Sequence, residues 1–172
     1  MRFKGDCFRA HDPNWAWRSL SGAGAALKGR RFNWPRLETL YLSLSFNTVY
    51  REVSGGFAHR LTPYVLCSYD VDCEDIADLR GDPERAALGI DLGDLACAWG
   101  DAIIAGKEPR SWAVVRRLIA EGYAGILVPS FANGATANDQ NLVLWRWGPE
   151  LPHRVMVYDP TGKLPKNQLS WK

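Results

Sequence analysis

The chain has 172 residues, a length that suits one domain and is short for two. Hydrophobic residues make up 47% and charged residues 23%, which is typical of a globular protein and excludes a disordered or fibrous one. The net charge of only +2 predicts neither a nucleic-acid nor a membrane partner. The uncharged stretch Thr39–Tyr50 is too short and too polar to span a bilayer.

The N-terminal segment and the cysteines predict a cytoplasmic protein. Met1–Arg9 mixes charged residues with glycine and lacks the apolar region of a secretory signal. The cysteines form no CxxC pair and have no histidine at zinc spacing; they are Cys7, Cys67, Cys73 and Cys97. We therefore expect reduced thiols in the cytosol.

Charge is distributed unevenly along the chain. Residues 1–60 carry ten Lys and Arg against four Asp and Glu, residues 61–108 carry three against eleven, and residues 109–172 carry eight against four. The basic first third, whose arginines lie in a turn-rich region, could hold a small anionic ligand. The alternative is that these charges only solvate surface loops.

The first third of the chain predicts two short strands around a loop region. Cys7–Ala10 is the first strand. Trp15–Asn33 is rich in Gly, Ser and Arg, so we expect an ordered loop region with little regular structure. Leucines at positions 40, 42 and 44 alternate with Tyr41, Ser43 and Ser45, which is the period-2 pattern of a strand with one buried face.

The middle of the chain predicts two short helices and a strand. One helix begins near Ser45 or Asn47 and ends at the glycine pair 55–56. Pro63–Val71 is a strand candidate. Asp82-Pro83 supplies an N-cap followed by proline at the first helical position, which predicts a helix over about 83–88.

The last third predicts a longer helix and three strands. The helix runs from about Pro109 to Glu121, with an apolar face that includes Val115 and Leu118, and ends at Gly122. The predicted strands are Gly125–Pro129, Leu142–Trp147 and Val155–Tyr158. The fold class that follows is α+β: a single compact domain of short strands in mixed or antiparallel sheets with flanking helices.

Several common motifs fail when their spacing is checked. Gly22 and Gly24 suggest a dinucleotide fingerprint, but the third glycine of that fingerprint is replaced by Leu27. Residues 100–107 resemble a phosphate-binding loop with wrong spacing, and we expect a helix end there. The acidic run 70–75 lacks the glycine of a calcium loop, which favours a solvated strand end. The histidines are scattered, so no metal site is predicted.

Four polar residues in apolar settings remain as candidates, and three of them have a plainer alternative. Arg31 lies between aromatic residues and could stack on a ring while presenting donors to phosphate, or it is a surface arginine. Tyr41 could wall a pocket, or it is an exposed tyrosine. Glu52 is either a helix-surface residue or a group with acid–base chemistry. Ser130 follows a buried-looking strand, where ligand contacts commonly lie.

Taken in chain order, five short segments resemble the RES domain family, which is named for its Arg, Glu and Ser. They are Lys28–Asn33, Leu40–Ser43, Glu52, Gly125–Ser130 and Asn141–Leu144. The resemblance identifies Arg31, Glu52 and Ser130 as the three naming residues and treats residues 1–172 as one RES domain with a core of about 9–158. It departs from the family at Arg30, where a glycine is usual, and after Ser130, where an arginine is frequent.

What the resemblance implies is a bacterial toxin whose antitoxin is an Xre-like helix-turn-helix protein, with a fold similar to that of ADP-ribosyltransferase toxins. Characterised members hydrolyse or phosphorolyse NAD+, or transfer ADP-ribose to a protein. The implied catalytic residues are Glu52, Arg31 and Ser130. The implied NAD-binding residues are Arg31, Tyr41, Arg9 and Asn141.

The chemistry of NAD+ cleavage is consistent with these residue types. Arginine binds pyrophosphate through paired hydrogen bonds. Breaking the nicotinamide–ribose bond develops positive charge on the ribose, which a carboxylate stabilises. Nicotinamide leaves as a neutral molecule, so no strong general acid is required. NAD+ is then the substrate, and no cofactor is expected.

Three functions stay open at this point: an NAD+-degrading toxin, a mono-ADP-ribosyltransferase, and a nucleotide- or partner-binding domain without turnover. The sequence favours the first. It does not distinguish water, phosphate and a protein side chain as the nucleophile.

Overall fold

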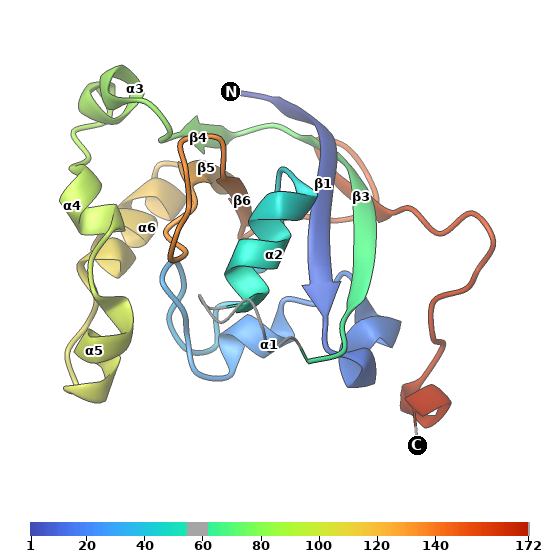
Figure 1. Ribbon diagram of the computed structural model, residues 1–172. Coiled ribbons are helices and arrows are strands. Elements are labelled where there is room, and N and C mark those ends of the chain that lie inside the picture. The colour runs from blue at the N-terminus through green and yellow to red at the C-terminus, as the bar shows by residue number, and fades with distance from the viewer. Residues whose placement is uncertain (55–61, 172) are drawn as a thin grey trace.

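The structure is a computed structural model that describes residues 1–54 and 62–171, and it contains one seven-stranded sheet with helices packed on it (Figure 1). The strands are β1 (Phe3–His11), β2 (Leu40–Ser43), β3 (Val65–Cys73), β4 (Ile76–Asp78), β5 (Gly125–Pro129), β6 (Gln140–Leu144) and β7 (His153–Val157). The helices are α1 (Ala23–Ala26), α2 (Phe46–Ser54), α3 (Asp82–Ala87), α4 (Leu92–Leu95), α5 (Trp99–Ile104) and α6 (Arg110–Ala120), with 3-10 helices η1 (Pro13–Arg18) and η2 (Gln168–Trp171). The predicted α+β class is confirmed.

The sheet is mixed, with the strand order β4-β5-β6-β2-β1-β3-β7. Only β4 and β5 run parallel, and the other neighbours are antiparallel. In the centre, β2 pairs with β6 so that Ser43 lies opposite Asn141 and Tyr41 opposite Val143. Because side chains alternate between the two faces of a strand, this register places all four on one face.

Apolar side chains fill both sides of the sheet. One cluster includes Leu42, Tyr69 and Leu142. The other cluster joins Ile126 and Val143 to α6. α6 buries residues at positions 112, 115 and 118, a helical spacing that gives one continuous apolar face. In Figure 1, α3 to α6 gather on one side of the molecule and α2 lies in front of the sheet.

Several predicted elements are confirmed. The strand Gly125–Pro129 has the predicted bounds, and the alternating leucines form β2. The two proline-started helices are α3 and α6, and α6 ends as expected because Gly122 adopts φ +93°. The helix end predicted over residues 100–107 is confirmed, since α5 ends at Ile104 and Gly106 has φ +67°.

Other predicted bounds are wrong. The strand predicted over 142–147 is β6, which begins and ends earlier, because the Trp145 and Arg146 amides both donate to the Ala124 carbonyl and leave the ladder. β1, β3 and β7 extend beyond or are shifted from their predicted ranges, and the expected loop region of residues 15–33 contains most of η1 and all of α1. β4, α4 and the start of α5 were not predicted. α2 begins at Phe46, and its predicted glycine stop lies outside the described residues.

The acidic run 70–75 is a solvated strand end except at Asp72. The Asp72 side chain is buried and accepts hydrogen bonds from Arg2 Nε at 2.6 Å and Arg2 Nη2 at 2.9 Å. Hydrogen bonding from Arg2 holds the pKa of Asp72 below its usual range. The partner that makes this burial possible is 70 residues away, so the local sequence could not indicate it.

Removing side-chain volume from the centre of the sheet should destabilise the fold. Leu142 is fully buried, so Leu142→Ala is expected to lower the free energy of unfolding by about 2–5 kcal/mol, measured by urea denaturation. Ile104 is 87% exposed, and Ile104→Ala should change that free energy by less than about 0.5 kcal/mol. Equal losses in the two variants would contradict the described packing.

Candidate active site

A pocket of about 860 Å³ lies against the sheet and is closed by residues from the first third of the chain. β1, η1, residues 21–32, β2, α2 and β6 contribute to its wall. Five of the six residues singled out from the sequence line it: Arg9, Arg31, Tyr41, Glu52 and Asn141. The sixth, Ser130, is buried behind Glu52 rather than in the pocket wall.

Side chains from distant elements hold the backbone around Arg31 in place. The Trp112 indole donates to the Arg30 carbonyl at 2.8 Å, and the Ser111 hydroxyl donates to the Arg31 carbonyl. The next carbonyl along the chain accepts from the Trp145 indole at 3.0 Å. Since this segment has no regular secondary structure, these bonds replace the ladder that a strand would provide.

The Arg31 guanidinium is anchored on one side and open on the other. Nη1 donates to the carbonyls of Leu95 and Cys97 at 2.9 and 2.8 Å. The expected stacking on an aromatic ring occurs with Phe131, whose centroid lies 4.7 Å from the guanidinium carbon. Burial lowers the pKa of Arg31, and Glu52 opposes that effect. The Nε and Nη2 donors have no hydrogen-bond partner among the described residues, so this edge is available to a ligand.

Tyr41 lines the pocket with its hydroxyl fixed. The hydroxyl donates to Asn33 Oδ1 at 2.9 Å and accepts from the Phe32 amide at 3.1 Å. The Asn33 side chain is fully buried and donates in turn to the carbonyls of Ala25, Trp34 and Leu37. Burial raises the pKa of Tyr41, so the phenol stays neutral.

Glu52 projects from α2 into the pocket and is held by two donors. Its Oε1 accepts from Ser130 Oγ at 2.7 Å and from Asn141 Nδ2 at 2.6 Å. The Asn141 amide is oriented by Ser43, whose hydroxyl donates to Asn141 Oδ1 at 2.8 Å. Oε2 has no hydrogen-bond partner in the part of the chain that the structure describes. One carboxylate oxygen is thus fixed and the other is free to face a ligand.

Asp139 fixes α2 relative to Ser130. The Asp139 side chain is buried and accepts from Thr48 Oγ1 of α2 at 3.0 Å, while its carbonyl accepts from the Ser130 amide at 2.7 Å. Hydrogen bonds from Thr136 hold the pKa of Asp139 below its usual range. Because one residue binds both elements, the contact between Glu52 and Ser130 is determined by the backbone as well as by the side chains.

Arg9 and His11 line the opposite part of the pocket, on β1. Arg9 Nη1 donates to the carbonyls of Ser19 and Ser21 at 3.4 and 3.1 Å, and burial lowers the pKa of Arg9. His11 Nε2 lies 2.5 Å from the Tyr69 hydroxyl, which itself donates to the Ser19 carbonyl. Because the Tyr69 hydroxyl donates its proton to the Ser19 carbonyl, it accepts a hydrogen bond from His11 Nε2.

Three supporting residues were missed from the sequence alone. Ser43 lies two residues after Tyr41 on the same strand, so the period-2 pattern could have placed it on the pocket face. Phe131 follows Ser130, but nothing local indicates that it stacks on Arg31. The contact of His11 with Tyr69 depends on strand pairing 58 residues apart, for which the sequence offers no signal.

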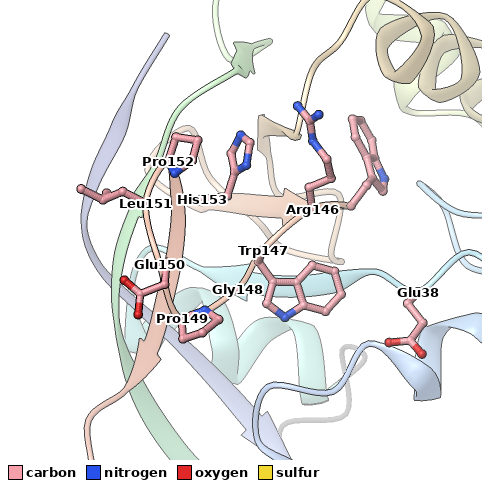
Figure 2. Close-up of a pocket in the computed structure, with 10 residues that line it drawn as sticks. Glu38, Arg146, Trp147, Gly148, Pro149, Glu150, Leu151, Pro152 and His153 are labelled. Atoms are coloured by element: carbon pink, nitrogen blue, oxygen red, sulfur yellow. The ribbon is translucent and has the colours of Figure 1, made fainter.

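A second hollow of about 620 Å³ lies beside the connection between β6 and β7 (Figure 2). Its wall consists of Glu38 and residues 145–153. Arg146 forms an ion pair with the Asp75 carboxylate at 3.4 Å, and His153 Nε2 lies 3.1 Å from the same carboxylate. None of the residues singled out from the sequence lines this hollow.

The described residues lack both a metal-binding cluster and a membrane-spanning helix. Residues 1–54 and 62–171 contain no group of three or more His, Cys, Asp and Glu side chains arranged to hold a metal ion. Within the same ranges, no helix has both the length and the apolar character needed to cross a membrane.

The fold and the pocket define an α+β domain in which arginine, glutamate and serine side chains meet at one site. The family model of the RES domain matches residues 6–167. The chain therefore belongs to the RES domain family, as its motifs indicated. The crystal structure of the M. tuberculosis MbcT–MbcA toxin–antitoxin complex contains a chain of similar fold, with 23% identity and a TM-score of 0.59 over 92% of this chain and 84% of that one. None of the curated proteins matches this chain.

The buried His11 should make the stability of the protein sensitive to acid. Burial and the nearby Arg9 charge lower the pKa of His11 from 6.5 to about 4, so folding favours the neutral imidazole. The stability that depends on neutral His11 is fully present above pH 6.5 and is lost as the pH falls towards 4. The total loss in the free energy of unfolding is about 3 kcal/mol. The measurement is the free energy of unfolding by urea between pH 7.5 and 4.5. His11→Gln should flatten this dependence, and an unchanged slope would contradict the assignment.

Proposed function

We propose that this protein is the toxin of a bacterial toxin–antitoxin pair and that it degrades NAD+ by cleaving the nicotinamide–ribose bond. The observation that carries the proposal is the Glu52 carboxylate, held by Ser130 and Asn141 in a pocket that also contains the open edge of Arg31. Membership of the RES family supports it. In this function NAD+ is consumed as a substrate, and neither a cofactor nor a metal takes part.

Arg31 binds the pyrophosphate of NAD+ in this proposal. Its Nη1 is occupied by the carbonyls of Leu95 and Cys97, which leaves Nε and Nη2 as two parallel donors. Such a fork matches two phosphate oxygens, and the anchor on the other side prevents the guanidinium from rotating. Affinity thus comes from a group that the protein has oriented before the ligand arrives.

Tyr41 contributes a rigid aromatic surface for the nicotinamide ring. Its hydroxyl is bonded to Asn33 and to the Phe32 amide, so the position of the phenol ring is set independently of the ligand. A flat, neutral ring is suited to packing against nicotinamide, which is itself planar.

Glu52 stabilises the charge that develops when the bond breaks. Nicotinamide leaves with the electron pair of the bond between its ring nitrogen and ribose C1′, and positive charge grows on the ribose. The free Oε2 of Glu52 faces this charge, while Ser130 and Asn141 keep Oε1 in place. Water then adds to C1′ and releases a proton, giving ADP-ribose. With phosphate as the nucleophile, the product carries that phosphate on C1′.

The partner in this proposal is an Xre-like helix-turn-helix antitoxin, and the site of action is the cytoplasm, where NAD+ is abundant. Its support is family membership together with the similar fold found in the M. tuberculosis toxin–antitoxin complex.

Removing the charge of Glu52 should abolish most of the turnover. Glu52→Gln keeps the shape of the side chain, so we expect turnover of NAD+ to fall by at least about a hundredfold while the Kd for NAD+ changes much less. Purified protein is incubated with NAD+, with and without phosphate, and the products are identified by mass spectrometry. Glu38→Gln, at an exposed carboxylate outside the pocket, is the control and should retain activity. Full activity in Glu52→Gln would contradict the proposal.

The same variants test the toxin function in a bacterium. Expression of the wild-type chain without an antitoxin should deplete NAD+ and stop growth, and Glu52→Gln should relieve both effects. Growth arrest at normal NAD+ levels, with ADP-ribose attached to a protein, would contradict the proposed NAD+ degradation and favour the transferase reaction.

Replacing Arg31 by lysine should separate charge from geometry. Arg31→Lys keeps the positive charge but loses the two-donor edge, so we expect affinity for NAD+ to fall by about tenfold to a hundredfold. The Kd is measured by calorimetry in the Glu52→Gln background, where NAD+ survives the titration. A thermal melt of Arg31→Lys checks that the variant still folds without the hydrogen bonds of Arg31 to the Leu95 and Cys97 carbonyls. If the folded variant binds NAD+ with unchanged affinity, Arg31 does not bind the pyrophosphate.

A further inference from the structure

Arg30 directly precedes Arg31 in the chain, is exposed, and lines the same pocket. Its backbone is fixed from both sides: its amide donates to the Asn33 carbonyl at 2.9 Å, and its carbonyl accepts from the Trp112 indole at 2.8 Å. The preceding Gly29 has φ +74°, and a Cβ there would come within 2.9 Å of the Asn33 carbonyl. The chain therefore keeps the glycine that the turn requires and places an arginine where the turn faces the pocket.

Arg9 and Arg30 bring two positive charges to the same pocket. The charge of Arg30 acts with burial, the larger cause, to lower the pKa of Arg9. In the described part of the chain, neither guanidinium forms an ion pair with a carboxylate, whereas nine other arginines do. Two like charges in one concave surface repel each other, and a bound anion relieves that repulsion.

Arg9 is anchored separately from the Arg31 edge. Arg9 is bonded to carbonyls that follow η1, whereas Arg31 is bonded to carbonyls at and after the end of α4. In Figure 1, β1 and α4 lie on different sides of the molecule. Arg18 lines the pocket as well, so a ligand that spans it meets cationic side chains around Arg9 in addition to the Arg31 edge. A pyrophosphate at Arg31 leaves the charges around Arg9 unused.

We propose that Arg30, together with Arg9, forms a second phosphate subsite that makes the pocket prefer a nicotinamide dinucleotide with a third phosphate, on the 2′ position of the adenosine ribose. The inference rests on the proposed function for the nucleotide class and adds the identity of the preferred substrate. A phosphate monoester presents three oxygens and close to two negative charges, which two guanidiniums satisfy.

The test compares ADP-ribose with ADP-ribose 2′-phosphate, because neither contains the bond that the enzyme is proposed to cleave. Calorimetry should show the 2′-phosphorylated nucleotide binding at least tenfold more tightly to the wild-type protein. Arg30→Ala should reduce that preference by about tenfold to a hundredfold, since one set of charged hydrogen bonds is lost. Arg30→Lys should retain part of it. Lys28→Ala removes a neighbouring exposed charge that does not line the pocket, and it should leave the preference unchanged.

The outcomes separate this inference from the proposed function. Equal affinity for the two nucleotides, or a preference that survives Arg30→Ala, would overturn the subsite. An equal loss of affinity for both nucleotides in Arg30→Ala would place Arg30 on the pyrophosphate and would also overturn it. Preferential binding without cleavage of either dinucleotide would leave the subsite standing and refute the proposed NAD+ degradation.

Discussion

Side chains alternate between the two faces of β6, and those on one face support the pocket. Asn141 donates to Glu52, Val143 lines the pocket, and Trp145, just beyond the strand, donates to the Phe32 carbonyl. The glutamate and the arginine segment come from different parts of the chain, yet both are positioned from this single face. A slip of one residue in the pairing of β6 would turn all three side chains to the other side of the sheet. The apolar contacts that fix this register, around Leu142 and Leu144, therefore also determine the geometry of the site.

Hydrogen bonds to backbone carbonyls complete the other half of the site. Residues 30–33 pass into the interior without joining a strand, so their polar groups need partners that a ladder does not supply. The indoles of Trp112 and Trp145 and the Ser111 hydroxyl provide them. This arrangement explains how a segment of irregular backbone can present Arg31 as accurately as a strand or helix would.

The sequence predicted those features that depend on local patterns. Alternating leucines located β2, an N-terminal proline located α3, and helical spacing located α6. The resemblance to the RES family brought Arg31, Glu52 and Ser130 together as candidates. In the structure Arg31 and Glu52 line the pocket, and Ser130 donates to Glu52 from outside its wall. The partners of those residues could not be found in the same way, because Trp145 lies 113 residues from Phe32 and Asn141 lies 89 residues from Glu52. Such contacts are set by strand order, which a local pattern does not contain.

The two indoles that bind the arginine segment also have a spectroscopic consequence. Trp112 and Trp145 are almost fully buried, and each indole nitrogen is bonded to a carbonyl within two residues of Arg31. The emission of an indole responds to its hydrogen bonding and to nearby water, so a change in this segment alters the fluorescence of the protein without an attached label. Ligand binding at the pocket can therefore be followed by the intrinsic tryptophan fluorescence of the protein. Replacing Trp112 or Trp145 with phenylalanine isolates the contribution of each indole.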